Sequence, residues 1–155
     1  MQRQRTSKAC TVKGAHMPEL PELEVVCEVL NRRVAGQIIE RVEVLPPGGA
    51  IVVRDLTQRG LDAALRGARI AEVTRRGKFL RFAVVDNPLW LVVNPKLTGR
   101  LQLAAAGDRR YAKTALVLVL ADGQELRYVD QKTMGQIYLA ELLDDVPGYA
   151  GMGPE

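Results

Sequence analysis

A succession of short apolar segments separated by turn residues constrains the fold of this chain more than any other feature. Turn signals lie between the segments, most clearly Asp86-Asn87-Pro88 and Asp122-Gly123, and the second of these favours a two-residue hairpin. Strands joined by such short connections pair antiparallel, so the sequence predicts a β-sandwich or a barrel. The expected strands cover residues 38–45, 69–74, 79–85, 89–93, 99–103, 116–121 and 125–128.

A long helix is expected before the strands, over residues 17–34. It begins with Pro18 and Pro21, in a first turn where a missing N–H costs no hydrogen bond. Apolar residues then recur at spacings of three and four between Leu23 and Val34, which gives the helix one apolar face.

Three other segments are less regular. Residues 46–49 read Pro-Pro-Gly-Gly and should break the chain after the first strand, whereas residues 56–65 are expected to form a short second helix. Residues 136–142 fit either a last strand or a short helix. The expected fold class is therefore α+β and mainly β, with an N-terminal helix and a second short helix.

Composition and charge limit the possible functions. The chain has 155 residues, of which 47% are hydrophobic and 26% charged, which suits one globular domain. No apolar run approaches the ~20 residues that span a bilayer, so we expect no membrane partner. The net charge of +4 resides in residues 1–16, and from Met17 onward the acidic and basic residues balance. Nucleic-acid binding would therefore require a local basic face.

Cysteine and histidine are scarce. Cys10 and Cys27 form no disulfide framework and no zinc-binding pair, and His16 is the single histidine. We expect no metal and no cofactor in this chain, and a reducing, cytoplasmic compartment. Residues 1–16 are expected to be a basic tail, or to result from a start codon assigned upstream of Met17; an organelle transit peptide is a less favoured alternative.

Three polar segments could carry function. The basic turn Arg75-Arg76-Gly77-Lys78 joins two expected strands, and three cations on one turn suit contact with phosphates. Its alternative interpretation is an ordinary solvated hairpin tip. Residues 94–99 and 130–135 are irregular segments next to strands, and each taken alone fits an ordinary loop.

Taken together and in order, these segments resemble one family. Residues 17–24 read MPELPELE and resemble the MPELPEVE that opens formamidopyrimidine-DNA glycosylases and endonuclease VIII enzymes. Residues 75–80 (RRGKFL) are similar to the RRGKYL hairpin of that family, and residues 126–130 (LRYVD) to its LRYxD strand. Further matches are Leu97-Thr98-Gly99 to Met-Ser-Gly, Gly135 to the glycine that closes DPRRFG, and Gly153-Pro154-Glu155 to the start of the interdomain linker.

The resemblance implies a two-sheet antiparallel β-sandwich and a bifunctional DNA repair enzyme. Such an enzyme removes oxidised bases from damaged double-stranded DNA and nicks the abasic strand by β,δ-elimination. The resemblance makes Pro18 the nucleophile through a Schiff base, Glu19 the general acid and base, and Glu22 a supporting carboxylate. It assigns Lys78 a catalytic contact with a phosphate near the lesion, and Arg75 and Arg76 to DNA binding.

The sequence departs from the family pattern at the nucleophile. Met17 precedes Pro18, so the proline nitrogen can attack only if the chain starts at Met17 and that methionine is removed. If residues 1–16 are retained, the nitrogen is an amide. The alternative function is therefore a non-catalytic DNA-binding or interaction domain of the same fold. A small β-domain that binds RNA or protein is a third, less favoured interpretation.

The sequence also departs at the residues that fill the space of a flipped base. Leu97 stands where the family has methionine, and residues 132–134 read Lys-Thr-Met instead of Arg-Arg-Phe. Leu97 and Met134 can still wedge between bases as apolar groups. Lys132 keeps a positive charge for DNA binding but lacks the planar fork of arginine.

The end of the chain is expected to be a domain boundary. We expect residues 17–146 to form the catalytic domain of a monomer and residues 147–155 to begin a linker. The resemblance implies a second domain, with a helix–two-turn–helix and a structural zinc finger, that is absent from this sequence.

Overall fold

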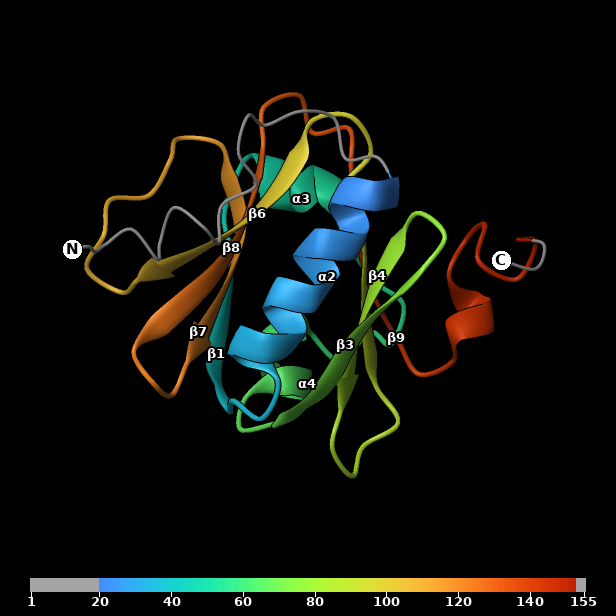
Figure 1. The fold of residues 1–155 in the computed structure, drawn as a ribbon, viewed down its shortest axis with the longest axis horizontal. Coiled ribbons are helices and arrows are strands. Elements are labelled where there is room, and N and C mark those ends of the chain that lie inside the picture. The colour runs from blue at the N-terminus through green and yellow to red at the C-terminus, as the bar shows by residue number, and fades with distance from the viewer. Residues whose placement is uncertain (1–19, 153–155) are drawn as a thin grey trace.

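The structure, a computed structural model, describes residues 20–152 and consists of two β-sheets and a long helix (Figure 1). One sheet has the order β1-β7-β8-β6, formed by β1 (Ile39–Val44), β7 (Thr114–Leu120), β8 (Gln124–Asp130) and β6 (Gly99–Ala105). The other has the order β2-β9-β5-β4-β3, formed by β2 (Val53–Asp55), β9 (Gln136–Ala140), β5 (Trp90–Asn94), β4 (Phe79–Val84) and β3 (Ile70–Arg76). All neighbouring strands are antiparallel except β2 and β9, which pair in parallel. The expected two-sheet sandwich is thus confirmed.

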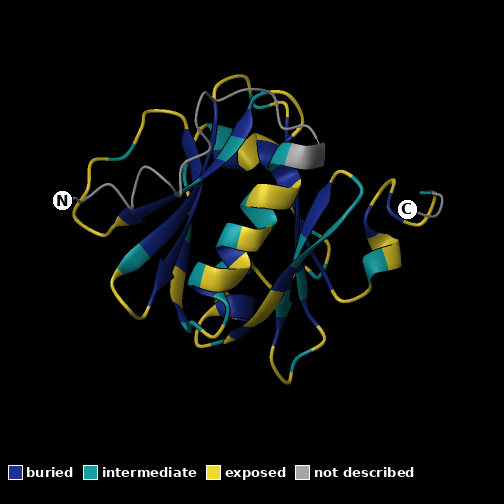
Figure 2. Ribbon diagram, in the orientation of Figure 1, coloured by how far each residue is buried: buried dark blue, intermediate teal, exposed yellow. Residues whose placement is uncertain are grey.

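Apolar residues of both sheets form the main core (Figure 2). Strands β4 and β6 alternate along their length, so that Leu101 and Leu103 are buried while Arg100 and Gln102 are partly exposed. Strand β7 is buried at every position, which fits its place between β1 and β8.

Helix α2 (Leu20–Val34) lies between the two sheets in the view of Figure 1. Its apolar face is buried through Leu23, Leu30 and Val34, as the spacing predicted. Two polar contacts attach the helix to β3: the Val73 N–H donates to Asn31 Oδ1 at 2.9 Å, and Cys27 Sγ donates to the Val73 carbonyl at 3.4 Å. Burial raises the pKa of the Cys27 thiol.

The segment from residue 46 to residue 65 differs from expectation. The Pro-Pro-Gly-Gly stretch does not only break the strand, because helix α3 (Gly48–Val52) begins within it. The expected helix 56–65 was too long, and only α4 (Leu61–Leu65) forms. The reason is Asp55: its carboxylate accepts N–H groups from Thr57, Gln58 and Gly60 and holds residues 56–60 in a turn.

The last segment packs on the outer face of the five-stranded sheet. Residues 136–140 form strand β9, which decides between the two expected alternatives. A short 3₁₀ turn, η2 (Leu143–Asp145), then leads to Val146 and Tyr149, which are buried against Phe79 of β4. The Tyr149 and Phe79 ring centroids lie 5.6 Å apart, so the chain is part of this packed layer beyond residue 146. No helix within residues 20–152 is long and apolar enough to cross a membrane.

Candidate nucleic-acid interface

The predicted basic turn is a tight hairpin between β3 and β4. Arg76 pairs with Phe79, and Gly77 closes the turn with a φ of +59°, a conformation that glycine adopts without strain. Lys78 is exposed, with Nζ 5.6 Å from the centroid of the Phe79 ring. Arg76 is half-buried, and its guanidinium lies 5.8 Å from the centroid of the Tyr149 ring.

Arg75 holds this hairpin against helix α2. Its Nε donates to Glu24 Oε1 at 2.6 Å, and its Nη1 donates to the Gly77 carbonyl at 2.8 Å. The Arg75 side chain is only 16% exposed. The predicted DNA contact of Arg75 therefore stays a prediction, whereas its contacts in the structure join the turn to the helix.

The beginning of α2 lies at the same end of the molecule as the hairpin turn (Figure 1). Glu22, the expected supporting carboxylate, is in the first turn of α2, and its Oε1 is buried without a hydrogen-bond partner in the part of the chain that the structure describes. Pro18 and Glu19 lie outside the described residues. Their predicted roles remain predictions.

Two loops at this end carry exposed apolar side chains. Leu97, in the loop between β5 and β6, is 53% exposed, and Met134, in the loop between β8 and β9, is 38% exposed. Lys132 is exposed beside Met134. Single exposed apolar side chains are common on protein surfaces, so what distinguishes these two is that their loops lie at the same end of the domain as the basic hairpin.

The carboxylate of Asp130 lies between these two loops. Its Oδ1 accepts hydrogen bonds from the Thr98 hydroxyl and, at 3.3 Å, from the Met134 N–H. Its Oδ2 accepts the Tyr128 hydroxyl at 2.7 Å and the Gly135 N–H at 2.8 Å. Asp130 is 1% exposed. Burial alone would raise the pKa of Asp130, but the four hydrogen bonds outweigh it and the pKa is lowered.

Sequence reasoning did not assign a role to Asp130, Thr98 or Tyr128. A signal was present, because an aspartate that ends an apolar strand and precedes an irregular loop often caps the N–H groups of that loop. What the sequence could not indicate is that Thr98, 32 residues away, donates to the same carboxylate.

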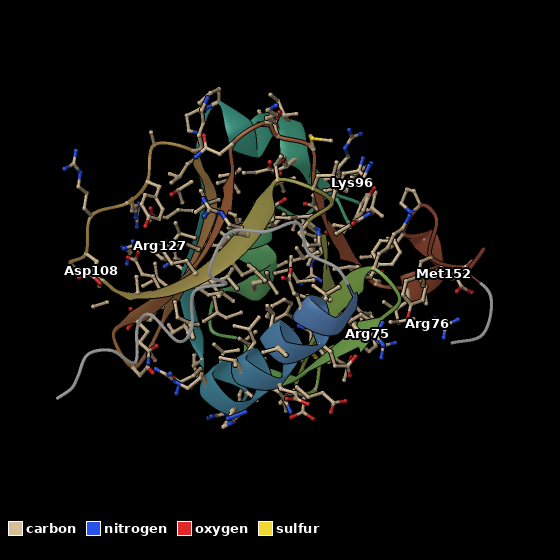
Figure 3. All side chains as sticks on the ribbon, turned by 45° about the horizontal axis from the view of Figure 1, so that its top comes forward. Arg75, Arg76, Lys96, Asp108, Arg127 and Met152 are labelled. Carbon is tan, nitrogen blue, oxygen red and sulfur yellow. The ribbon has the colours of Figure 1, made fainter. Side chains whose placement is uncertain are left out.

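A second polar network lies on the opposite side of the domain (Figure 3). Arg127 is fully buried and donates to Glu125 Oε1 at 2.9 Å and to the carbonyls of Ala105, Asp108 and Arg109. Figure 3 places Arg127 and Asp108 far from Arg75, Arg76 and Lys96. This network holds the loop between β6 and β7 in place.

Metal ligands are not gathered anywhere in the described part of the chain. Residues 20–152 contain no group of three or more His, Cys, Asp or Glu side chains placed to hold a metal ion. Cys27 is a free thiol that is hydrogen-bonded to a backbone carbonyl. The described residues therefore do not fit a zinc site.

The chain forms a two-sheet β-domain. One end of it carries a basic hairpin and two loops with apolar tips, and both loops are hydrogen-bonded to the same buried carboxylate. The model of the formamidopyrimidine-DNA glycosylase N-terminal domain matches residues 17–137, so the chain belongs to this family. The predicted family and fold are thereby confirmed.

Known relatives and structures agree with this assignment. A formamidopyrimidine-DNA glycosylase of Nocardioides sp. is 43% identical over 135 residues, which are 84% of this chain and 45% of that protein. The structure of Lactococcus lactis Fpg with abasic-site DNA has a TM-score of 0.76 at 30% identity, covering 88% of this chain and 49% of that one. The complex of the same protein with FAPY-dG-containing DNA also gives 0.76 at 30% identity, covering 88% and 50%. The chain thus spans about half the length of the relatives it matches.

Proposed function

We propose that the protein acts in base-excision DNA repair, as a bifunctional glycosylase that removes an oxidised base and then nicks the abasic strand. The observation that carries the proposal is that one end of a domain of this family collects the start of α2, the Arg75–Lys78 hairpin and the tips Leu97 and Met134. The solved complexes of the Lactococcus lactis relative with abasic and FAPY-dG DNA support damaged duplex DNA as the partner.

The proposed chemistry begins at Pro18. Its secondary amine attacks C1′ of the damaged nucleoside, the glycosidic bond breaks, and the base leaves with the bond electrons and takes up a proton. The amine then loses its proton and the sugar ring opens at the C1′–O4′ bond, with O4′ taking up a proton, to give an iminium. The iminium makes the C2′ proton acidic, so its removal expels the 3′ phosphate, and a second elimination expels the 5′ phosphate. Glu19 donates and accepts the protons of ring opening and elimination, and Glu22 supports it.

The hairpin and the loops hold the DNA in this proposal. Lys78 pairs with a phosphate beside the lesion, and Arg76 adds a second cation to the same turn. Leu97 and Met134 occupy the space that the flipped nucleotide leaves in the stack, and Lys132 contributes charge next to them. The structure supports these roles by the exposure of Lys78, Leu97, Met134 and Lys132.

We further propose that a second domain completes the DNA clamp. The relatives are about twice as long as the matched region, and we propose that zinc is held in that second domain. Phosphate contacts from a second domain raise affinity by releasing counterions. We place the protein in the cytoplasm, as a monomer, with chromosomal DNA as its partner.

Borohydride trapping tests the proposal. A protein that starts at Pro18, extended by its natural C-terminal sequence if the gene encodes one, is incubated with abasic-site duplex and borohydride. We expect a covalent adduct that is lost when residues 1–17 precede Pro18, because the nitrogen is then an amide. The absence of an adduct from the Pro18-initiated protein would refute the proposed glycosylase and lyase activity. A native protein whose intact mass includes residues 1–17 would support the non-catalytic DNA-binding alternative.

A further inference from the structure

The two apolar tips share an unusual backbone feature. Leu97 follows Lys96, whose φ is +52°, and Met134 follows Thr133, whose φ is +51°. Residues other than glycine rarely adopt this left-handed conformation, and it persists only where surrounding contacts maintain it. The backbone before each tip is therefore in a conformation that contacts from elsewhere in the protein must stabilise.

Asp130 is the anchor that both loops share. One oxygen, Oδ1, accepts the hydroxyl of Thr98, the residue after Leu97, and also the N–H of Met134 itself. The loops are thus joined through a single buried atom, although Thr98 and Asp130 are 32 residues apart. Charge-assisted hydrogen bonds of this kind are about twice as strong as neutral ones.

Tyr128 packs against the Asp130 carboxylate and against both loops. Its hydroxyl donates to Asp130 Oδ2 at 2.7 Å and occupies the space beside Gly99 and Gly135. A Cβ built at Gly99 or at Gly135 would overlap the Tyr128 hydroxyl. Both loops therefore approach the ring so closely that only glycine fits at these two positions.

We propose that Asp130 is a positioning residue that sets Leu97 and Met134 as one rigid wedge before DNA binds. This inference rests on the proposed function, because it assigns the wedge to the same site. Its physical basis is preorganisation: side chains and loops that are already ordered do not pay their ordering entropy when the complex forms. Asp130 itself is buried and acts on the DNA only through the two loop tips.

The first measurement uses no DNA. Amide hydrogen exchange compares the protein with Asp130→Asn, which replaces one acceptor oxygen by an amide nitrogen that cannot accept. We expect exchange at the Met134 and Gly135 amides to accelerate by about tenfold or more, because the loops open locally. Asp122→Asn is the matched control. The Asp122 carboxylate lies in the exposed turn at the other end of β8 and accepts a hydrogen bond from the Gln124 N–H. An asparagine at this position can accept the same hydrogen bond.

The second measurement compares binding to abasic-site duplex with binding to intact duplex of the same sequence. We expect Asp130→Asn to weaken abasic-site binding by roughly tenfold, the cost of ordering the tips during binding, and to leave intact-duplex binding unchanged. Thr98→Val removes a single donor and provides a milder variant in case Asp130→Asn does not fold. It should weaken abasic-site binding by a smaller factor and lower the thermal stability less than Asp130→Asn does.

A double-mutant cycle separates positioning from general structural support. If Thr98 acts through the tip, the effect of Thr98→Val on abasic-site binding disappears in a Leu97→Ala background. Additive effects would overturn the proposal, as would unchanged exchange in Asp130→Asn, or faster exchange with unchanged abasic-site binding. Equal binding of both duplexes by the unmodified protein would instead refute the proposed function, and the exchange experiment would still decide whether Asp130 holds the loops.

Discussion

Replacing Tyr128 by phenylalanine tests the energetics of the Asp130 site directly. The substitution removes one hydroxyl and leaves the ring in place. In the folded protein the hydroxyl donates to Asp130 Oδ2 at 2.7 Å, and both residues are 1% exposed. The variant therefore leaves a buried, charged oxygen with one donor, the Gly135 N–H, in place of two.

The expected loss follows from the charge and the burial. A hydrogen bond to a charged group contributes about 1.5–3 kcal/mol, and water cannot replace the donor at a buried site. We expect Tyr128→Phe to lower the free energy of unfolding by about 2 kcal/mol, which corresponds to a Tm lower by roughly 4–8 °C in a domain of this size. Tyr138→Phe is the matched control, because its hydroxyl donates at the same 2.7 Å to Gln136, a neutral and partly solvated acceptor. Its loss should be about 0.5–1 kcal/mol.

Urea unfolding at several pH values provides the assay. The pKa of Asp130 is lowered in the folded state, so the stabilisation that depends on its charge is complete above the ordinary aspartate pKa and is lost as the pH falls through the folded value. The difference between the protein and Tyr128→Phe should be constant from about pH 5 to pH 8 and should shrink below about pH 4.

Unfolding at alkaline pH provides a second test, because there the stability should fall as the pH rises. Burial, followed by the hydrogen bond to Asp130, raises the pKa of Tyr128, so its contribution is complete below the ordinary tyrosine pKa and is lost as the pH rises above about 10. Tyr128→Phe lacks this alkaline loss. Equal losses in Tyr128→Phe and Tyr138→Phe, or a difference that does not shrink as the pH falls through the folded pKa of Asp130, would refute the reasoning that a buried charge sets the magnitude.

Three further predictions concern other parts of the domain. Arg127→Met should destabilise the fold by about 3–5 kcal/mol in urea unfolding, because buried Glu125 keeps only the partly exposed Arg110 as a partner and three backbone carbonyls lose a donor; methionine at Glu125 as well should recover only part of this loss. Tyr149→Ala should cost about 3 kcal/mol by thermal denaturation, since it removes a ring that packs on β4, whereas Tyr149→Phe should cost much less. Lys78→Ala should reduce the slope of log affinity for DNA against log salt by about one, while Arg66→Ala, directly after α4 at the other end of the domain, should leave it unchanged.

Local patterns in the sequence predicted the elements whose structure depends on near neighbours. The apolar spacing from Leu23 to Val34 predicted the buried face of α2, and Arg75–Lys78 predicted the hairpin, because each feature depends on residues a few positions apart. The order of the motifs along the chain predicted the family and the two-sheet sandwich. The family model and the Lactococcus lactis structure confirmed both.

Errors arose where a distant strand or a side chain competes with local propensity. Residues 53–55 join the sheet because β9, more than 80 positions later, offers a parallel edge, and Asp55 then holds the following residues in a turn. The same strand β9 remained ambiguous in the sequence, since a short apolar run fits a strand or a helix until its partners are known.

The sequence by itself determined the chemistry that this end of the domain can offer: a basic turn, exposed apolar residues and an aspartate at the end of a strand. Only the tertiary structure decided that Leu97 and Met134 are held through one carboxylate and that Arg75 contacts α2. The physical reason is that hydrogen bonds between residues 32 and 51 positions apart depend on sheet register and packing, and no local spacing encodes them.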